Sequence, residues 1–373
     1  MDNLVKHFVL ISLVLLSLLM TFDLGCGLYL SNPVYSLDDA MNKPNNLSNV
    51  RFTNAEPTNV IKPGAKWDSI YQFLFKGHRH RKPDQPLPVV AMDGFVRQPA
   101  ADGFRFVWLG HSSVLVELDS KRILIDPVFS DRASFLSWTG TKRFQPAPVN
   151  ARDLPAIDAV LISHNHYDHL DKPTIMDIME KAASFHVPLG VAALLKRWGV
   201  PASKIHEHAW WDEHEINGIS IAATPARHFS GRGLFDQNRT LWCSWVICRN
   251  GKKVFHSGDT GKTVQFKEIS TKYGPFDLTF IKIAAYNESW PDIHLNPEQA
   301  VGAYLDLGGK TLVPIHWATF DLSVHSWYEP IERFIKAAEQ NHARTITPKM
   351  GEIVNPERYE NGYWWREILN ASK

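Results

Sequence analysis

Short apolar runs alternate with amphipathic, helix-like stretches along the chain from Phe104 onward. Runs of this kind predict strands, and strands separated by helical patterns are typical of α/β proteins. The strands are predicted at residues 104–107, 114–118, 122–125, 159–162, 219–223, 241–248, 253–255, 278–283 and 311–315. The helices are predicted to begin near residue 173, with Asp171 placed as a cap, and to cover residues 297–307 and 329–340.

The first 30 residues have the pattern of a targeting segment. Lys6 precedes an apolar stretch at residues 8–22, which is short for a membrane span and long enough for a signal peptide. The tripeptide ending at Cys26 resembles a bacterial lipoprotein cleavage site, so lipoprotein processing and an uncleaved anchor remain alternatives. With Lys6 held in the cytoplasm, we expect a membrane-associated protein whose folded domain lies on the periplasmic or extracytoplasmic side.

After residues 1–30, we divide the chain into an N-terminal arm at residues 31–100 and one α/β domain at residues 101–373. Asn, Pro and Ser are frequent in the first part of the arm. Further on, one apolar helix face is formed by Trp67, Ile70, Tyr71 and Leu74. A basic cluster follows this face, as in helices that lie on a membrane surface, although a helix packed into the core would show the same pattern.

The composition narrows the functional classes. The net charge of +1 provides no field that would attract a polyanion, so we expect no nucleic-acid partner. The three cysteines do not form a disulfide framework, because Cys243 and Cys248 point to opposite faces of one expected strand. The 17 histidines are more informative, since imidazole is the commonest metal ligand in proteins.

The segment at residues 163–171, Ser-His-Asn-His-Tyr-Asp-His-Leu-Asp, concentrates metal-ligating side chains directly after an expected strand. His228, Asp259 and His316 also follow expected strands. Because binding sites of layered α/β folds are assembled at the carboxyl ends of strands, these residues are expected to meet there. Imidazole and carboxylate together suit zinc, iron or manganese.

The histidine-rich segment resembles the HxHxDH signature of the metallo-β-lactamase superfamily, and the stretches that end at His228, Asp259 and His316 resemble its later ligand motifs. The resemblance implies a four-layer αββα sandwich with a site for two divalent ions, with zinc favoured. One ion would be held by His164, His166 and His228, the other by Asp168, His169 and His316, with Asp259 bridging them.

Additional blocks of sequence resemble the N-acyl-phosphatidylethanolamine-hydrolysing phospholipase D subfamily. They include Trp-Leu-Gly-His at residues 108–111, Gly-Pro-Phe-Asp at residues 274–277 and His-Trp at residues 316–317. The resemblance covers about residues 50–350. It implies a phospholipid substrate, contact with a membrane surface and release of N-acylethanolamine and phosphatidic acid. The oligomeric state stays undecided, with a homodimer as one alternative. Arg227, His256 and residues 287–289 depart from the pattern of the animal enzymes.

Roles for the other site residues follow from the same resemblance and from their positions. Two ions together can lower the pKa of a bridging water and present hydroxide to a phosphorus or carbonyl centre. Asp168 would also accept the proton of the water, and His294 would bind the phosphate or protonate the leaving oxygen. The remaining assignments are Tyr286 in contact with the substrate, Asp126 and His111 behind the ligands, and His206, His208 and His214 as surface residues.

Two other functions fit parts of the sequence. A lactonase of the same superfamily would share every ligand but act on a small, soluble substrate. An envelope lipid-binding protein with structural metals belongs to a different class, and its metal sites would be closed. The predicted ligand set leaves a position open between the ions, which favours an enzyme. A ribonuclease would need a more basic surface than this composition provides.

Overall fold

A computed structural model of the chain describes residues 50–65, 67–68, 71–72, 80–92 and 103–371. The targeting segment predicted at residues 1–30 lies outside these residues, as do Ile70 and Leu74 of the candidate interfacial helix. Within the described part of the chain, no helix has both the length and the apolar character needed to cross a membrane.

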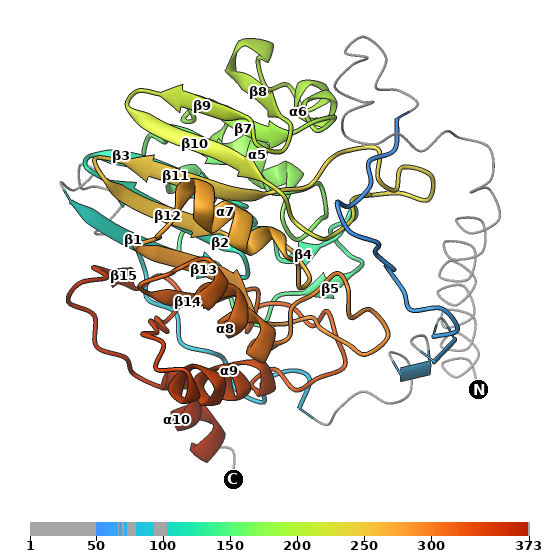
Figure 1. The fold of residues 1–373 in the computed structure, drawn as a ribbon, viewed down its shortest axis with the longest axis vertical. Helices are drawn as coiled ribbons and strands as arrows, with labels where there is room; N and C mark the ends of the chain where they lie inside the picture. The colour runs from blue at the N-terminus through green and yellow to red at the C-terminus, as the bar shows by residue number, and fades with distance from the viewer. Residues whose placement is uncertain (1–49, 66, 69–70, 73–79, 93–102, 372–373) are drawn as a thin grey trace.

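Two mixed β-sheets form the centre of the molecule (Figure 1). The larger sheet contains, in spatial order, β15 (Ile353–Val354), β1 (Phe104–Gly110), β2 (Ser113–Leu118), β3 (Lys121–Ile125), β6 (Ala159–Leu161), β7 (Phe185–Pro188) and β8 (Ile205–His208). The smaller sheet contains β14 (Leu312–Ile315), β13 (Leu278–Lys282), β12 (Lys252–His256), β11 (Ser244–Arg249), β10 (Ile219–Thr224) and β9 (Glu213–Ile216). A separate hairpin pairs β4 (Arg132–Ala133) with β5 (Thr141–Lys142).

Helices cover the outer face of each sheet. Against the larger sheet lie η2 (Ala151–Asp153), α5 (Lys172–Ile178) and α6 (Ala192–Arg197), with η3 (Ala202–Lys204) before β8. Against the smaller sheet lie α7 (Gln265–Tyr273), α8 (Pro297–Asp306) and α9 (Glu329–Gln340), and α10 (Trp364–Ala371) ends the chain (Figure 1). Buried apolar side chains of both sheets, such as Phe106 and Phe280 in edge-to-face contact, fill the space between them. The four-layer αββα arrangement expected from the resemblance is therefore confirmed.

Most predicted strands and helices are present, and α9 covers the predicted residues. The strand predicted at residues 241–248 instead begins at Ser244, because the preceding segment bonds to the other sheet. The backbone N–H of Leu241 donates to Leu189, and that of Cys243 donates to Ser163. Strands β4, β5, β7, β8, β9 and β15 and helices α6, α7 and α10 were not predicted.

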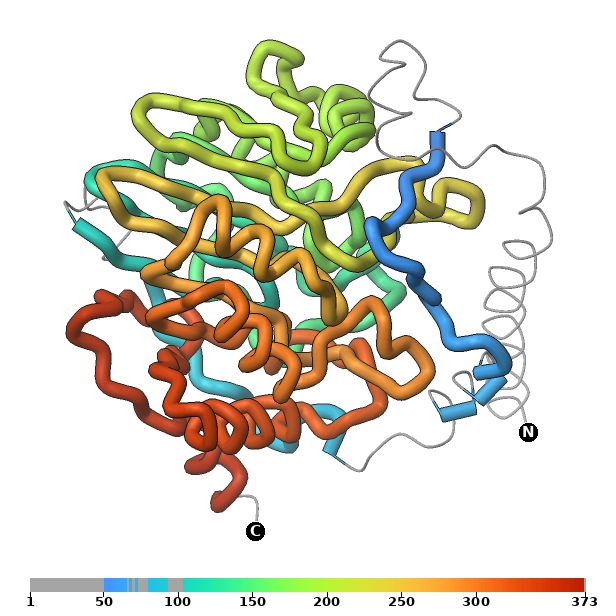
Figure 2. The backbone as a smooth tube through the Cα atoms, viewed as in Figure 1, coloured from blue at the N-terminus to red at the C-terminus, as the bar shows by residue number. Residues whose placement is uncertain are grey.

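The first described stretch of the arm, residues 50–65, lies along the edge of the molecule, and its beginning runs beside the loop that follows β10 (Figure 2). Its Val50 and Phe52 are buried, and the Phe52 N–H donates to the Asn238 carbonyl over 2.8 Å. The Asn54 side chain donates to the His228 carbonyl and accepts from the His228 N–H. The arm therefore forms part of the frame of the site.

Candidate metal centre

The predicted ligands converge because each follows the end of a strand. His164 comes after β6, His228 after β10, Asp259 after β12 and His316 directly after β14. The backbone is tightly constrained at this edge. Gly258 has φ of 53°, and a Cβ atom there would lie 2.6 Å from the Ser163 Cβ, so only glycine fits beside Asp259.

The first group of candidate ligands is His164, His166 and His228. Their ligand atoms lie within 4.8 Å of one another. The His164 Nε2 atom is 2.8 Å from His166 Nδ1, and the His228 Nε2 atom is 3.3 Å from the same Nδ1. These three imidazoles therefore face a common point.

The second group contains Asp168, His169 and His316, and His111 joins it. Asp168 Oδ2 lies 2.9 Å from His111 Nε2, 3.5 Å from His316 Nε2 and 3.6 Å from His169 Nε2. His111 and His316 both have positive φ, at 52° and 65°. Non-glycine residues in this conformation cluster at functional sites, where the surrounding structure holds them in place.

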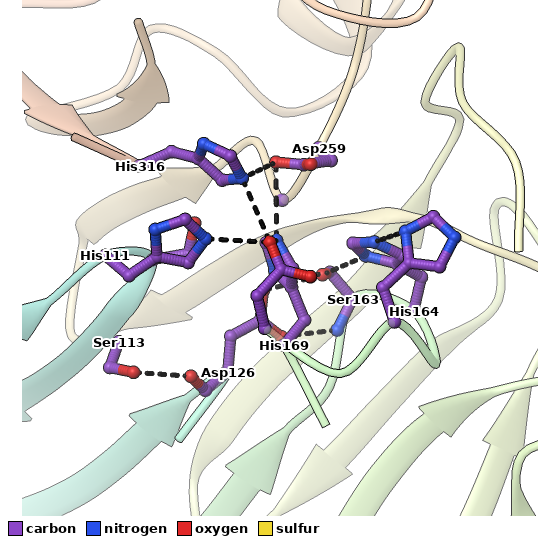
Figure 3. Close-up of polar contacts among 12 residues, drawn as sticks. His111, Ser113, Asp126, Ser163, His164, His169, Asp259 and His316 are labelled. Atoms are coloured by element: carbon purple, nitrogen blue, oxygen red, sulfur yellow. Dashed lines mark hydrogen bonds and ion pairs between the residues drawn. The ribbon is translucent and has the colours of Figure 1, made fainter. Parts of the chain in front are cut away.

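Asp259 lies between the two groups and faces both (Figure 3). Its Oδ1 atom is 3.1 Å from His316 Nε2 and 3.4 Å from His169 Nε2. Its Oδ2 atom is 3.8 Å from His228 Nε2 and 3.7 Å from His294 Nδ1. A carboxylate placed in this way can give one oxygen to each of two ions.

The chemistry of the site fits resident metal ions. Several buried polar atoms that point into it have no hydrogen-bond partner, namely His169 Nε2, His316 Nε2, Asp259 Oδ1 and His294 Nδ1. Buried polar groups without partners are costly, so their convergence in one place indicates that something else satisfies them. Divalent ions with nitrogen and oxygen ligands would do so.

Asp126 and Ser163 hold the ligand rings from behind. The Asp126 Oδ2 atom lies 2.7 Å from His169 Nδ1 and 2.6 Å from the Ser163 hydroxyl that donates to it. Asp126 Oδ1 accepts from the Ser163 N–H. On the other side, His228 Nδ1 lies 3.0 Å from the Ile293 carbonyl. Contacts of this type fix the orientation of a metal-binding imidazole and the nitrogen that carries its proton.

Electrostatics favour the charge states that metal binding needs at His164, His166 and Asp168, and oppose them at His169, which would have to lose a proton. Burial lowers the pKa of His164 well below its usual value and lowers the pKa of His166 to about 4, which keeps these rings neutral. Burial acts against ionisation of Asp168, but His169 and His111 hold its pKa well below the usual range. Burial also opposes a charge on His169, yet the carboxylates of Asp259 and Asp168 raise its pKa well above the usual value. Without a metal, a proton on His169 balances these anions.

Lys282, which ends β13, was not predicted to belong to the site. Its side chain is fully buried, and its ammonium lies 3.6 Å from Asp259 Oδ1. Burial lowers its pKa to about 8. A lysine at the end of an apolar strand that leads to the site edge was the signal that could have revealed it.

His294 lies between the ligand groups and an open cavity of about 370 Å³. Around this cavity are Tyr286, Asn287, His294, His325, Glu329 and Arg333. The Tyr286 hydroxyl donates to the Glu329 carboxylate, and the Tyr286 ring stacks on the ring of His325. His325 was not predicted to belong to the site. The structure therefore brings His294 to the metal centre and places Tyr286 farther out, on the cavity wall.

The departures from the subfamily pattern have structural roles here. Arg227 holds the arm to the site loops, because its guanidinium donates to the Pro57 and Lys262 carbonyls and pairs with Asp292 at 3.3 Å. His256 is buried below the site, where its Nε2 lies 2.9 Å from the Ser112 carbonyl.

The assignment of His206, His208 and His214 to the surface was wrong for His208 and holds only in part for the other two. His208 is buried, and the other two are partly buried. The error follows from the missed strands, since β8 and β9 turn these rings toward the space between the two sheets.

Comparisons with known proteins agree with this geometry. Residues 121–317 match the family described as the beta-lactamase superfamily domain. The chain is 44% identical over 298 residues to an uncharacterised protein of Mycobacterium tuberculosis, covering 79% of each chain. It is 36% identical over 289 residues to N-acyl-phosphatidylethanolamine-hydrolyzing phospholipase D 1 of Caenorhabditis elegans, covering 72% of this chain and 80% of the relative.

Solved structures share the fold at lower identity. A metallo hydrolase from the archaeon Ignicoccus hospitalis superimposes with a TM-score of 0.53 at 23% identity, covering 69% of this chain and 99% of its own. Taken with the converging histidines and carboxylates, these matches establish that the chain belongs to the metallo-β-lactamase superfamily, as a metal-dependent hydrolase related to N-acyl-phosphatidylethanolamine-hydrolysing phospholipase D.

Proposed function

We propose that the protein is a phosphodiesterase that hydrolyses N-acyl-phosphatidylethanolamine-type phospholipids to N-acylethanolamine and phosphatidic acid. The observation that carries the proposal is the placement of Asp259 between two groups of ligands, in a chain with a phospholipase D relative of this specificity. Exposed aromatic side chains beside the ligand loop, such as Phe135, suit a lipid substrate better than a small soluble one.

In this proposal His164, His166 and His228 would hold one divalent ion, Asp168, His169 and His316 would hold the other, and Asp259 would contribute to both. Zinc is our preferred metal, because imidazole and carboxylate ligands without cysteine suit it. Bound ions of this type make water a nucleophile near neutral pH and neutralise the charge of a phosphodiester.

The residues of the chain supply the proton transfers. Asp168 is held ionised beside His111 and His169, so its carboxylate can accept the proton of the attacking water. The new bond joins that water oxygen to phosphorus, and the bond that breaks joins phosphorus to the ethanolamine oxygen. The departing oxygen needs a proton. His294 is suitably placed to donate it, because its ring lies between the ligand groups and the cavity.

The membrane is the expected source of substrate. Phe135 and Trp138, in the loop between β4 and β5, are 71% and 73% exposed. The Phe135 ring lies 6.4 Å from that of Tyr167, which belongs to the ligand loop. Phe235, from the loop after β10, is 55% exposed. We propose that these aromatic side chains enter the lipid interface on the extracytoplasmic side, where amphipathic rings bind well.

Turnover of defined vesicles tests the function. Zinc-loaded protein should release N-acylethanolamine from vesicles containing N-acyl-phosphatidylethanolamine, and oxygen-18 from labelled water should appear in the phosphatidic acid. His294→Gln should lower kcat by about 100-fold or more, the usual contribution of a positioned acid. Hydrolysis of a soluble lactone, with no product from vesicles, would contradict the proposal and support the lactonase alternative.

A further inference from the structure

We infer that a second, separate site for a transition-metal ion lies between the edges of the two sheets, formed by His186, His206, His208 and His214. Strands β7 and β8 supply the first three, and β9 of the other sheet supplies the fourth. His186 is paired with His206 across β7 and β8, and His206 and His208 are two residues apart. Side chains two residues apart in a strand share a face, so these three rings all point toward the smaller sheet.

The His186 ring is nearly as close to the other three rings as the rings of the catalytic site are to one another, and His208 and His214 are 5.9 Å apart. The ring centroids of His186 lie 4.8 Å from His206, 5.2 Å from His208 and 5.3 Å from His214. The corresponding separations within His164, His166 and His228 are 4.5, 4.8 and 5.1 Å. Such packing of four imidazoles at the end of a sheet sandwich, where apolar side chains are expected, calls for a specific use.

The hydrogen bonds of Ser184 determine which nitrogen of His186 is free. The Ser184 hydroxyl donates its single proton to the Asp158 carbonyl over 3.0 Å. Its oxygen, 3.1 Å from His186 Nε2, must therefore accept from that nitrogen. In the neutral ring the proton is then on Nε2, and the Nδ1 lone pair points to His208 Nε2 at 2.9 Å. A metal-binding imidazole is oriented in the same way, by donation from its other nitrogen.

The spacing of these two nitrogens suits a metal. Two ligand nitrogens about 2.0–2.1 Å from an ion, at square-planar to tetrahedral angles, lie about 2.9–3.4 Å apart. Among the described residues, the groups whose ligand atoms already lie within 4.8 Å of one another belong to the catalytic site. His206 and His214 must therefore turn their rings to complete the new site, and both are partly exposed, so rotation is easy.

The surroundings select the class of ion. Burial and the neighbouring imidazoles lower the pKa of His186 to about 2 and that of His208 to about 4, so both rings are neutral at physiological pH. The groups that shift the pKa of His186 are the other three histidines, without a carboxylate among them. A site of neutral imidazoles favours Cu²⁺, Ni²⁺ or Zn²⁺ over Mg²⁺ or Ca²⁺, and its ion would join the two sheet edges.

Metal counting tests the inference. Full-length protein is saturated with Zn²⁺, dialysed in a zinc buffer and analysed for bound metal, beside a His206→Ala/His214→Ala variant and a His342→Ala control at an exposed histidine. We expect the double variant to bind one equivalent less than wild type and the control, with hydrolytic activity unchanged. Equal metal contents in wild type and double variant would overturn the inference.

A measurement on wild type alone keeps the test valid if the variant does not fold. One equivalent of Cu²⁺ is added to protein whose catalytic site is already filled with Zn²⁺, and its electron paramagnetic resonance spectrum is recorded. We expect hyperfine splitting from several nitrogen ligands, and quenching of Trp245 fluorescence, since the Trp245 ring lies 5.5 Å from His208. A spectrum of aqueous Cu²⁺, or activity lost in step with Cu²⁺ binding, would refute a separate site.

Discussion

The carboxylate of Asp126 lies 2.7 Å from Nδ1 of His169, and both side chains are fully buried. Replacing one Asp126 oxygen by an amide nitrogen, as in Asp126→Asn, either removes this acceptor or turns a donor toward Ser163. We expect metal affinity to fall by 10–100-fold, a usual effect for partners of ligand histidines. Chelator competition measures it. Asp158→Asn, at a carboxylate that pairs with Lys121 away from the site, is the control and should bind metal normally.

The contribution of Lys282 to the free energy of unfolding should depend on whether metal is bound at Asp259. In metal-free protein, Lys282→Met removes a buried cation 3.6 Å from the Asp259 carboxylate, and breaking a buried pair costs about 3–5 kcal/mol. Bound ions would neutralise Asp259 without Lys282, so the loss should be smaller in metal-loaded protein. Thermal unfolding with and without chelator measures the difference.

A matched control for this change is Lys310→Met, because Lys310 pairs with Asp277 at 2.8 Å on the surface, where its side chain is 63% exposed. Exposed pairs contribute little, so the control should lower the melting temperature only slightly and equally in both states. If Lys282→Met destabilises both states by the same amount, Lys282 acts on packing and does not balance the charge of the metal centre.

The catalytic site was largely predictable, whereas the histidine cluster between the sheet edges was not. His164 and His166 lie in one local motif, and His228 and His316 each follow an apolar run that is readable as a strand. Whether a residue lies at the end of a strand depends on the local sequence. It can therefore be predicted correctly even when other elements of the fold are missed. His208 faces His214 only because edge strands of two different sheets meet, and short strands with alternating charged residues and histidines carry no strong apolar pattern.

The histidine cluster predicts a loss of stability in acid. The titratable rings of His186, His206 and His214 lie around His208, and burial together with His214 and His206 lowers its pKa to about 4 from an ordinary 6.5. Between these values the unfolded chain binds a proton that the folded protein does not, so stability falls as the pH drops from about 6.5 toward 4.

Removing that proton site should flatten the profile. In metal-free His208→Gln, the slope of unfolding free energy against pH should be lower than in wild type by up to about 1.4 kcal/mol per pH unit in this range. Urea unfolding at pH 7.5 and pH 5 measures it. Identical slopes in the two proteins would mean that His208 is protonated in the folded state, against the burial seen here.

The exposed aromatic side chains near the ligand loop predict a selective effect on membrane substrate. Phe135→Ser with Trp138→Ser removes two side chains that are more than two-thirds exposed, so the folded protein should lose little stability. Burial of such rings in a lipid interface is favourable, at roughly 25 cal/mol per Å² of apolar surface. Vesicle binding in sedimentation assays should therefore weaken at least tenfold, and the apparent KM for vesicle substrate should rise. Hydrolysis of a short-chain, soluble phosphodiester should hardly change. Leu305→Ser is the control. Leu305 is half-exposed and lies in the last turn of α8, at the end of the helix away from His294, so this variant should bind vesicles as wild type does. Equal losses on vesicle and soluble substrates would show that the loop between β4 and β5 shapes the active site and does not dock it to the membrane.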